Sequence, residues 1–131
     1  MEIKNSSHIA QFVRPQINFL QEQVGCLILD SQLHLLKHKV LFLGTADQVL
    51  FHPRDLFRTI YEFNGTRFIL YHNHTSYNPL PSKEDLSLTR KLLKISQLLE
   101  IEFIDHMILA KESEVSLLEL GLLKKTHLPS Y

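Results

Sequence analysis

The chain is organised around residues 70–85, which read LYHNHTSYNPLPSKED. An apolar run, residues 67–71, leads into this stretch and predicts a strand, on which alternate side chains share a face. His72 and His74 therefore point to the same side, and the helix that begins near Ser82 returns Asp85 to their neighbourhood. Two imidazole nitrogens and one carboxylate oxygen would hold a tetrahedral zinc ion with its fourth position open, which is typical of a catalytic site.

Each part of this pattern also has a plainer interpretation. Two histidines on a strand are more often surface residues or satisfied core residues, and Ser-x-x-Asp alone is a capping box at a helix start. Glu84 is a rival to Asp85 as the third ligand, although neighbouring side chains of a helix point about 100° apart and cannot serve the same point. The whole spacing is His-x-His, then seven residues, then Ser-x-x-Asp. It is much harder to obtain by chance than its parts.

Composition bounds the class of protein. The chain has 131 residues, 44% hydrophobic and 21% charged, which fits one soluble globular domain with a single core. Basic and acidic residues balance at 14 each, so there is no electrostatic case for binding a phosphate backbone. No apolar run reaches about 18 residues, and the first residues lack the apolar core of a signal peptide. The single cysteine, Cys26, lies in an apolar run, which indicates a buried, inert thiol and favours a cytoplasmic location.

Periodicity and turn residues predict an alternation of helices and strands. Pro15 is expected to kink the first helix or to divide off a shorter second helix, and His34 and His38 are interpreted as solvent-facing. The expected elements are a helix over 6–21, strands over 24–29 and 33–43, a short extended piece over 49–51, a helix over 53–63 that ends at Asn64-Gly65, a strand over 66–72, a helix over 82–99, and strands over 101–109 and 114–117.

Apolar residues at helical spacing predict which faces of these helices are buried. The three expected stripes are Ile9, Phe12, Val13, Ile17 and Leu20 in the first helix, Leu56, Ile60 and Tyr61 in the second, and Leu88, Leu92, Ile95 and Leu99 in the third.

The spacing of the candidate ligands resembles the motif of JAMM, or MPN, metalloproteases, and nearly the whole chain resembles the JAMM-type domain of the bacterial RadC family. The resemblance implies a cytidine-deaminase-like JAMM/MPN fold of the α/β (α+β) class, a mixed central sheet flanked by helices. Residues 1–131 would then form one RadC-like domain, without the N-terminal helical region of longer family members. Beyond the metal motif, the likeness lies in residues 12–24, Gly44-Thr45, His52-Pro53-Arg54, Asp105-His106, Val115-Ser116-Leu117 and Gly121-Leu122-Leu123.

The resemblance also implies roles for single residues. His72, His74 and Asp85, rather than Glu84, would bind Zn²⁺. Glu22 would be the general base, although from the residues alone it reads as an exposed acid at a helix end. Ser82 would donate a hydrogen bond to the developing oxyanion. The histidines expected to lie outside the metal site are His8, His34, His38, His52 and His127.

The expected function is a zinc-dependent hydrolase that cleaves a peptide or isopeptide bond, with a protein or peptide substrate such as a ubiquitin-like tail. The alternatives are a non-catalytic JAMM-fold binding module and a DNA-repair-associated protein, which only Arg90-Lys91 and Lys124-Lys125 favour. Neither nucleic acid nor a membrane is expected as a partner.

Two details stay open. Asp105 either orients a ligand histidine or is a polar residue at a strand end. Thr75-Ser76-Tyr77 replaces the Pro-Ser-Gly usual in RadC proteins, which would alter the loop and the substrate preference.

Overall fold

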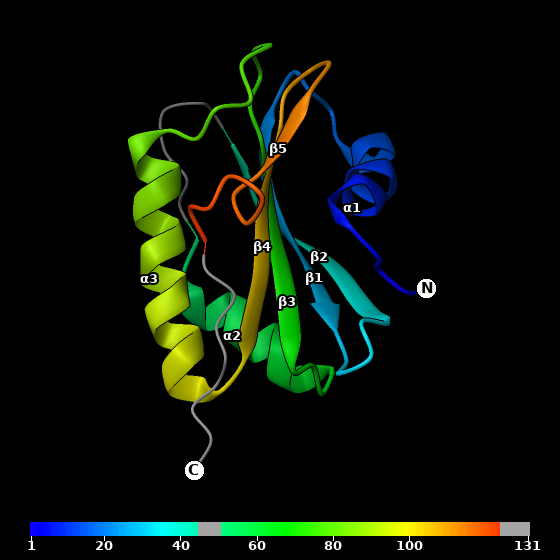
Figure 1. Ribbon diagram of the computed structural model, residues 1–131, viewed down its shortest axis with the longest axis vertical. Helices are drawn as coiled ribbons and strands as arrows, with labels where there is room; N and C mark the ends of the chain where they lie inside the picture. Colours follow the sequence, from blue (N-terminus) through cyan, green and yellow to red (C-terminus); the bar gives the residue numbers. More distant parts are fainter. Residues whose placement is uncertain (45–50, 124–131) are drawn as a thin grey trace.

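A five-stranded sheet forms the centre of the computed structural model, which describes residues 1–44 and 51–123 (Figure 1). The strand order is β2-β1-β3-β4-β5, and all neighbours are antiparallel except the parallel pair β3 and β4. The sheet is therefore mixed, and the predicted fold class is confirmed. The elements are α1 (Ser6–Val13), the 3-10 helix η1 (Arg14–Gln16), β1 (Glu22–Leu29), β2 (Leu35–Gly44), α2 (Pro53–Glu62), β3 (Arg67–Asn73), α3 (Lys83–Leu99), β4 (Glu102–Leu109) and β5 (Glu114–Ser116).

The sheet separates two layers of core, with α2 and α3 on one face and α1 on the other (Figure 1). Val24, Cys26 and Ile28 of β1 belong to the layer under α2 and α3, whereas Leu27 and Leu29 pack in the layer under α1. A strand buried on both faces reads as a continuous apolar run, which explains the sequence of β1. Cys26 has no exposed surface, so the prediction of a buried thiol is confirmed.

Helix α3 connects the two parallel strands and brings its own first turn to the carboxyl end of β3. Ser82 is the N-cap of this helix: its Oγ accepts the N–H of Asp85, and the Asp85 carboxylate accepts the N–H of Ser82. This capping box satisfies two of the N–H groups that a helix start leaves unpaired. In open α/β sheets, sites form at the carboxyl ends of parallel strands. The cap therefore holds Asp85 where a site is expected.

The first helix is shorter than the sequence predicts. Helix α1 ends at Val13, because Pro15 has no N–H to continue the ladder. Of the two effects expected of Pro15, the shorter second helix is confirmed as η1, and residues 17–21 are not helical. Leu20, expected on the buried face, is 86% exposed. Strand β1 consequently begins at Glu22, two residues before the expected start.

Two further expectations about buried faces are wrong. Tyr61 of α2 is 56% exposed, and Phe57 packs in the core in its place. In α3, Leu99 is 40% exposed, because the buried line of the helix runs through polar as well as apolar side chains. That line consists of Asp85, Thr89, Leu92 and Ser96.

The start of β2 and the environment of His38 also differ from expectation. Leu33 adopts a positive φ of 65° in the turn, so β2 begins at Leu35 rather than at residue 33. His38 is only half-exposed, because its Nε2 lies 2.6 Å from the hydroxyl of Tyr71 and its ring packs on Phe12.

The ends of α2 follow the prediction, with Pro53 in its first turn and Asn64 in the left-handed region. Most of the extended piece expected over 49–51 and the basic pair 124–125 lie outside the described residues. Among the helices in the described part of the chain, none is both long enough and apolar enough to cross a membrane.

Candidate metal centre

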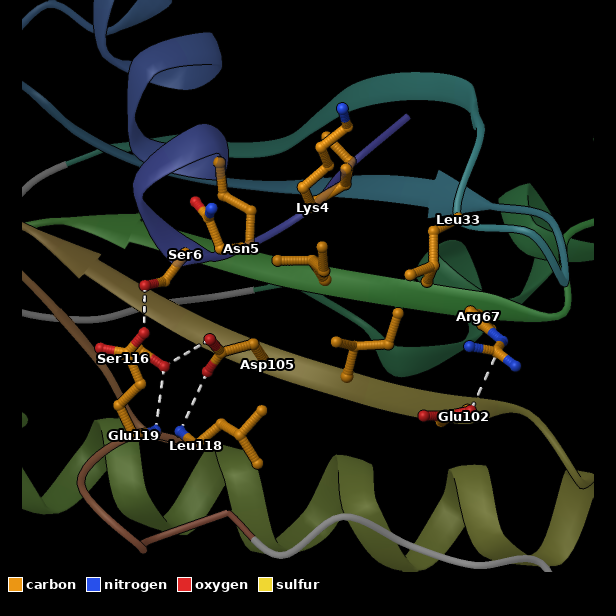
Figure 2. Close-up of a pocket in the computed structure, with 14 residues that line it drawn as sticks. Lys4, Asn5, Ser6, Leu33, Arg67, Glu102, Asp105, Ser116, Leu118 and Glu119 are labelled. Atoms are coloured by element: carbon orange, nitrogen blue, oxygen red, sulfur yellow. Dashed lines mark hydrogen bonds and ion pairs between the residues drawn. The ribbon is translucent and has the colours of Figure 1, made fainter. Parts of the chain in front are cut away.

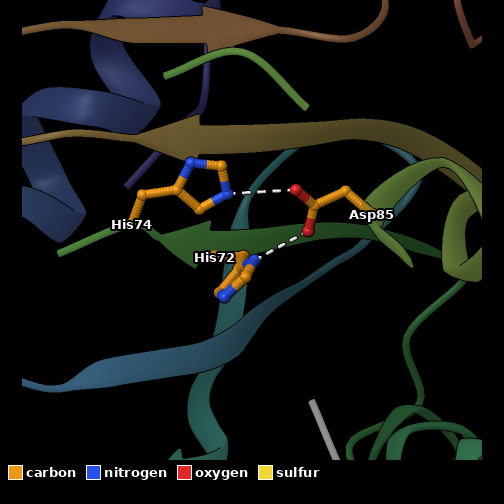
Figure 3. Close-up of side chains that lie close together, drawn as sticks. All are labelled: His72, His74 and Asp85. Atoms are coloured by element: carbon orange, nitrogen blue, oxygen red, sulfur yellow. Dashed lines mark hydrogen bonds and ion pairs between the residues drawn. The ribbon is translucent and has the colours of Figure 1, made fainter. Parts of the chain in front are cut away.

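His72, His74 and Asp85 meet at the carboxyl end of β3 (Figure 3). One ligand atom from each side chain lies within 4.8 Å of the other two. His72 is the last but one residue of β3, His74 follows the strand, and the cap of α3 places Asp85 opposite both. The structure thus brings together the three residues that the sequence pattern singles out, and it leaves Glu84 exposed.

The carboxylate of Asp85 bridges the two imidazoles. Its Oδ1 lies 2.8 Å from Nδ1 of His72, and its Oδ2 lies 3.0 Å from Nε2 of His74. Ligand atoms around a tetrahedral zinc ion, at bond lengths of 2.0–2.2 Å, are about 3.3 Å apart. The donor atoms, within 4.8 Å of one another, are therefore close enough to converge on one divalent cation.

A backbone carbonyl fixes the orientation of His74. Its Nδ1 lies 3.0 Å from the carbonyl oxygen of Asn78, which can only accept a hydrogen bond. Nδ1 therefore keeps its proton, and Nε2, which faces Asp85, is the nitrogen that can release a proton and serve as a metal ligand. A carbonyl of this kind leaves no signature in the sequence.

His72 contains a buried nitrogen that supports the same interpretation. In residues 1–44 and 51–123, its Nε2 is buried and has no hydrogen-bond partner; the nearest charged atom is Oε2 of Glu22, at 3.5 Å. Buried polar atoms without a partner are rare and call for an ion or a water molecule. Two imidazoles and one carboxylate, with one ring nitrogen of His72 left without a partner, thus fit a metal ion.

The pKa shifts show that the carboxylates and imidazoles stabilise one another's charges. Burial alone would lower the pKa of His72, but the hydrogen bond to Asp85 and the nearby Glu22 carboxylate outweigh burial and raise it to about 9. The hydrogen bond to Asp85 likewise raises the pKa of His74. Burial would raise the pKa of Asp85, yet the two histidines hold it far below its usual range. The site is an anionic centre that attracts protons or a cation.

Glu22 and Ser82 border the three candidate ligands. Glu22 is the first residue of β1 and is only 6% exposed, so its interpretation as an exposed acid at a helix end is wrong. The Oγ of Ser82 accepts the N–H of Asp85 at 3.1 Å, which leaves its own O–H proton available for another acceptor. The predicted catalytic roles of both residues stay predictions.

Asp105 does not orient a ligand histidine. Its carboxylate accepts hydrogen bonds from the Ser116 hydroxyl at 2.5 Å and from the N–H groups of His106 and Leu118. It lines a separate cavity of about 270 Å³ near the start of α1 (Figure 2). Asp105 therefore ties β4 to the end of β5, and the first of the two interpretations left open by the sequence is wrong.

Thr89 and His106 form a hydrogen-bonded chain that ends on the backbone of Asp85, and the sequence analysis assigned neither residue a role. The Thr89 hydroxyl donates to the carbonyl of Asp85 at 2.8 Å and accepts from Nδ1 of His106 at 2.7 Å. Burial lowers the pKa of His106 to about 3, so its ring is neutral. The only available signal was the spacing of Asp85 and Thr89, which four residues place on one helix face.

The loop after the histidines packs on the turn between β4 and β5. The N–H of Lys111 donates to the carbonyl of Ser76 at 3.2 Å, and the Lys111 ammonium lies 5.4 Å from the centre of the Tyr77 ring. These contacts tie the loop that follows the histidines to the turn between β4 and β5, beside the candidate metal centre. The expected effect of this loop on substrate preference stays a prediction.

A mixed sheet flanked by helices, with two histidines and an aspartate at the carboxyl end of an inner strand, is consistent with a JAB/MPN-type domain. Residues 3–122 match the family of RadC-like JAB domains, and the chain belongs to this family. Its relatives include UPF0758 proteins of Bacillus velezensis and of Thermotoga maritima, and the UPF0758 protein YsxA of Bacillus subtilis.

These relatives are 33–34% identical to this chain. The matches cover 92% of this chain but only 53–54% of each relative. The chain thus spans about half the length of the curated relatives it matches. Their names state no activity, so the assignment of a reaction must come from the site.

Proposed function

We propose that this domain is a zinc-dependent hydrolase of the JAMM type, which cleaves a peptide or isopeptide bond. The convergence of His72, His74 and Asp85 within 4.8 Å carries the proposal, because it creates a three-donor site beside a buried glutamate. His72, His74 and Asp85 would hold the zinc ion, which would supply a bound water of pKa about 7 and polarise a carbonyl group. Three protein ligands would leave a coordination position for that chemistry.

Glu22 and Ser82 supply the general base and the hydrogen-bond donor of the reaction. The Glu22 carboxylate, 3.5 Å from Nε2 of His72, accepts a proton from the attacking water and passes it to the leaving amine. Ser82 directs its O–H at the carbonyl oxygen as negative charge develops there. An interaction that strengthens in the transition state raises kcat, and its loss costs about 10²–10³ in rate.

A protein or peptide is the substrate class that this chemistry implies, and the tail of a ubiquitin-like protein is one candidate. The balance of basic and acidic residues does not favour nucleic acid. The cytoplasmic location that the single cysteine favours stays a prediction.

Metal analysis tests the proposal first. Wild-type protein purified without chelators should contain about one zinc ion per chain, and His74→Ala and Asp85→Asn should abolish binding. Glu84→Gln is a matched control, because Glu84 is adjacent to Asp85 but exposed. A wild type that binds no zinc even when zinc is supplied would end the proposal.

A hydrolysis assay with peptide and isopeptide libraries tests catalysis separately. Glu22→Gln should retain zinc and lose activity by a factor of about 10²–10⁴, the usual contribution of a general base. Equal activity of Glu22→Gln and wild type would dismiss Glu22 as the base. Zinc binding without hydrolysis of any library member would favour the non-catalytic binding module instead.

A further inference from the structure

We infer that Asn73 is a positioning residue for Glu22: its side-chain amide fixes the backbone on both sides of the glutamate relative to the two histidines. The inference rests on the proposed function, in which Glu22 is the general base. Asn73 lies between His72 and His74 in the chain and has no exposed surface. Among the described residues, its side chain forms no hydrogen bond with Glu22 or with the candidate metal ligands.

Two short hydrogen bonds join Asn73 to the residues that flank Glu22. Its Oδ1 accepts the N–H of Gln23 at 2.7 Å, and its Nδ2 donates to the carbonyl of Gln21 at 2.9 Å. One partner is a donor and the other an acceptor, so the amide has a single favourable orientation. Glu22 is thereby held between two anchored neighbours.

On the opposite edge of β1, β2 pairs with it as far as Glu22. On the β3 side the Asn73 side chain bonds β1 beyond the point where the backbone ladder between β1 and β3 stops. The last residues of β1 and β3 to pair are Val24 and His72. On its other side β3 stays paired with β4, where the N–H of His74 donates to the carbonyl of Leu109 at 2.8 Å. A primary amide presents one acceptor and one donor, as a peptide group does. The Asn73 side chain therefore extends the pairing between β1 and β3 to the residues on both sides of Glu22.

Few other side chains meet both requirements. Aspartate has the same shape but presents only acceptors when ionised, so one of its oxygens would face the Gln21 carbonyl. Leucine has a similar volume and offers neither group, which would leave a buried N–H without a partner. Because side chains alternate along a strand, Asn73 points away from His72 and acts through the backbone alone.

Three variants test the inference: Asn73→Leu, Asn73→Asp and the control Tyr71→Phe. Tyr71 is two residues earlier on the same face, and its hydroxyl bonds only the side chains of Gln23 and His38 among the described contacts. Amide hydrogen exchange of the zinc-loaded protein gives a readout that needs no substrate. In Asn73→Leu we expect exchange at the Gln23 N–H to rise at least about tenfold, with the amides of residues 26–28 unchanged.

Zinc affinity and kinetics distinguish positioning from a general structural role. Zinc affinity of Asn73→Leu should stay within about threefold of wild type, while kcat falls and KM does not change. Asn73→Asp should behave similarly because it loses the donor, and Tyr71→Phe should match wild type. The double variant Glu22→Gln/Asn73→Leu should be no slower than Glu22→Gln alone, since a residue that acts through Glu22 has nothing further to lose.

Contrary results are equally specific. Unchanged exchange at Gln23, a parallel loss of zinc affinity, or additive losses in the double variant would each overturn the role of Asn73. If wild type cleaves no library substrate, the proposed function fails, and the exchange and zinc measurements still decide whether Asn73 holds the Glu22 backbone.

Discussion

Asp85 contacts both histidines at once, and this contact makes metal binding compete with protons. Its two oxygens lie 2.8 Å and 3.0 Å from the imidazole nitrogens. Each nitrogen that donates to Asp85 must lose that proton before it can bind a metal ion. A single carboxylate therefore serves the site in two states, as an acceptor for imidazolium groups and as a metal ligand.

Thr89→Val tests the support behind Asp85. The variant keeps the shape of a 3% exposed side chain but removes the hydroxyl that accepts from His106 and donates to Asp85. Because the buried Nδ1 of His106 is left unpaired, we expect a loss of about 1–3 kcal/mol in the free energy of unfolding. Urea unfolding measures this change in free energy. Ser87→Ala, an exposed position on the same helix, should change stability by less than about 0.5 kcal/mol.

Cys26 should be unreactive in the folded protein. Burial raises the pKa of its thiol to about 12, so almost no thiolate is present at neutral pH. We expect labelling by a thiol reagent at pH 8 to be at least about a hundredfold slower than for unfolded protein, since reaction requires opening of β1. Rapid labelling without denaturant would show that β1 opens far more often than its complete burial indicates.

The site residues that could be predicted are those close together in sequence. His72, His74 and Asp85 lie on two consecutive elements, so strand alternation and helix geometry suffice to bring them together. The roles of Asn73, Thr89 and His106 depend on pairing across β1, β3 and β4, which no local pattern encodes. Register between distant strands is fixed by the packed sheet as a whole.

Among the elements, β4 shows most clearly why local reasoning fails. Phe68 pairs with Phe103 and Ile69 pairs with Asp105, so the register shifts by one residue at Ile104. Such an irregularity exchanges the faces of all residues beyond it. It places His106 beneath the candidate metal centre and Asp105 on the opposite face. Simple alternation from Phe103 would assign the reverse.

The boundaries of helices were predictable where a residue determines the cap. Ser82 and Pro53 mark helix starts as expected. The end of α1 was misjudged, because apolar residues at helical spacing continue past Pro15 although the residues after η1 are not helical. Periodicity alone does not show where a chain leaves a helix.

Two substitutions of Ser82 separate its structural role from its proposed catalytic role. Ser82→Ala removes the N-cap and should cost about 0.5–2 kcal/mol of stability, whereas Ser82→Gly should cost only a few tenths. Both lack the O–H group, so both should reduce kcat by about 10²–10³. Thermal unfolding and hydrolysis rates are the two measurements. A Ser82→Gly variant with wild-type kcat would restrict Ser82 to capping.

At the scale of the whole molecule, the sheet keeps the candidate metal centre apart from the cavity that Asp105 lines. His72 and Asp85 lie on the α3 side, and the cavity is bounded by Ile3, Ile9 and Ile69 on the α1 side. Several polar groups of that cavity pair with one another, such as Arg67 with Glu102 and Asp105 with Ser116. The unpartnered nitrogen of His72 is therefore the stronger indication of a ligand.

Zinc should reverse the pH dependence of stability between about pH 6.5 and 8.5. The pKa of His72 is 6.5 in the unfolded chain and about 9 in the metal-free fold. Its stabilisation is complete below pH 6.5 and is lost as the pH rises through 9. The pKa of Asp85 is lowered, so its own stabilisation is present above its unfolded value of 3.8 and is constant in this window.

Without zinc, the free energy of unfolding should therefore fall by at most about 1.4 kcal/mol per pH unit for each histidine proton that is released. With zinc bound, the imidazoles need no proton, and weaker competition from protons strengthens binding as the pH rises. Urea unfolding at pH 6.5, 7.5 and 8.5, with zinc and with a chelator, should give curves that diverge with pH. Asp85→Asn should flatten the metal-free curve, because the carboxylate that raises the pKa of both histidines is absent. Parallel curves for wild type with and without zinc would show that these histidines do not exchange protons for the metal ion.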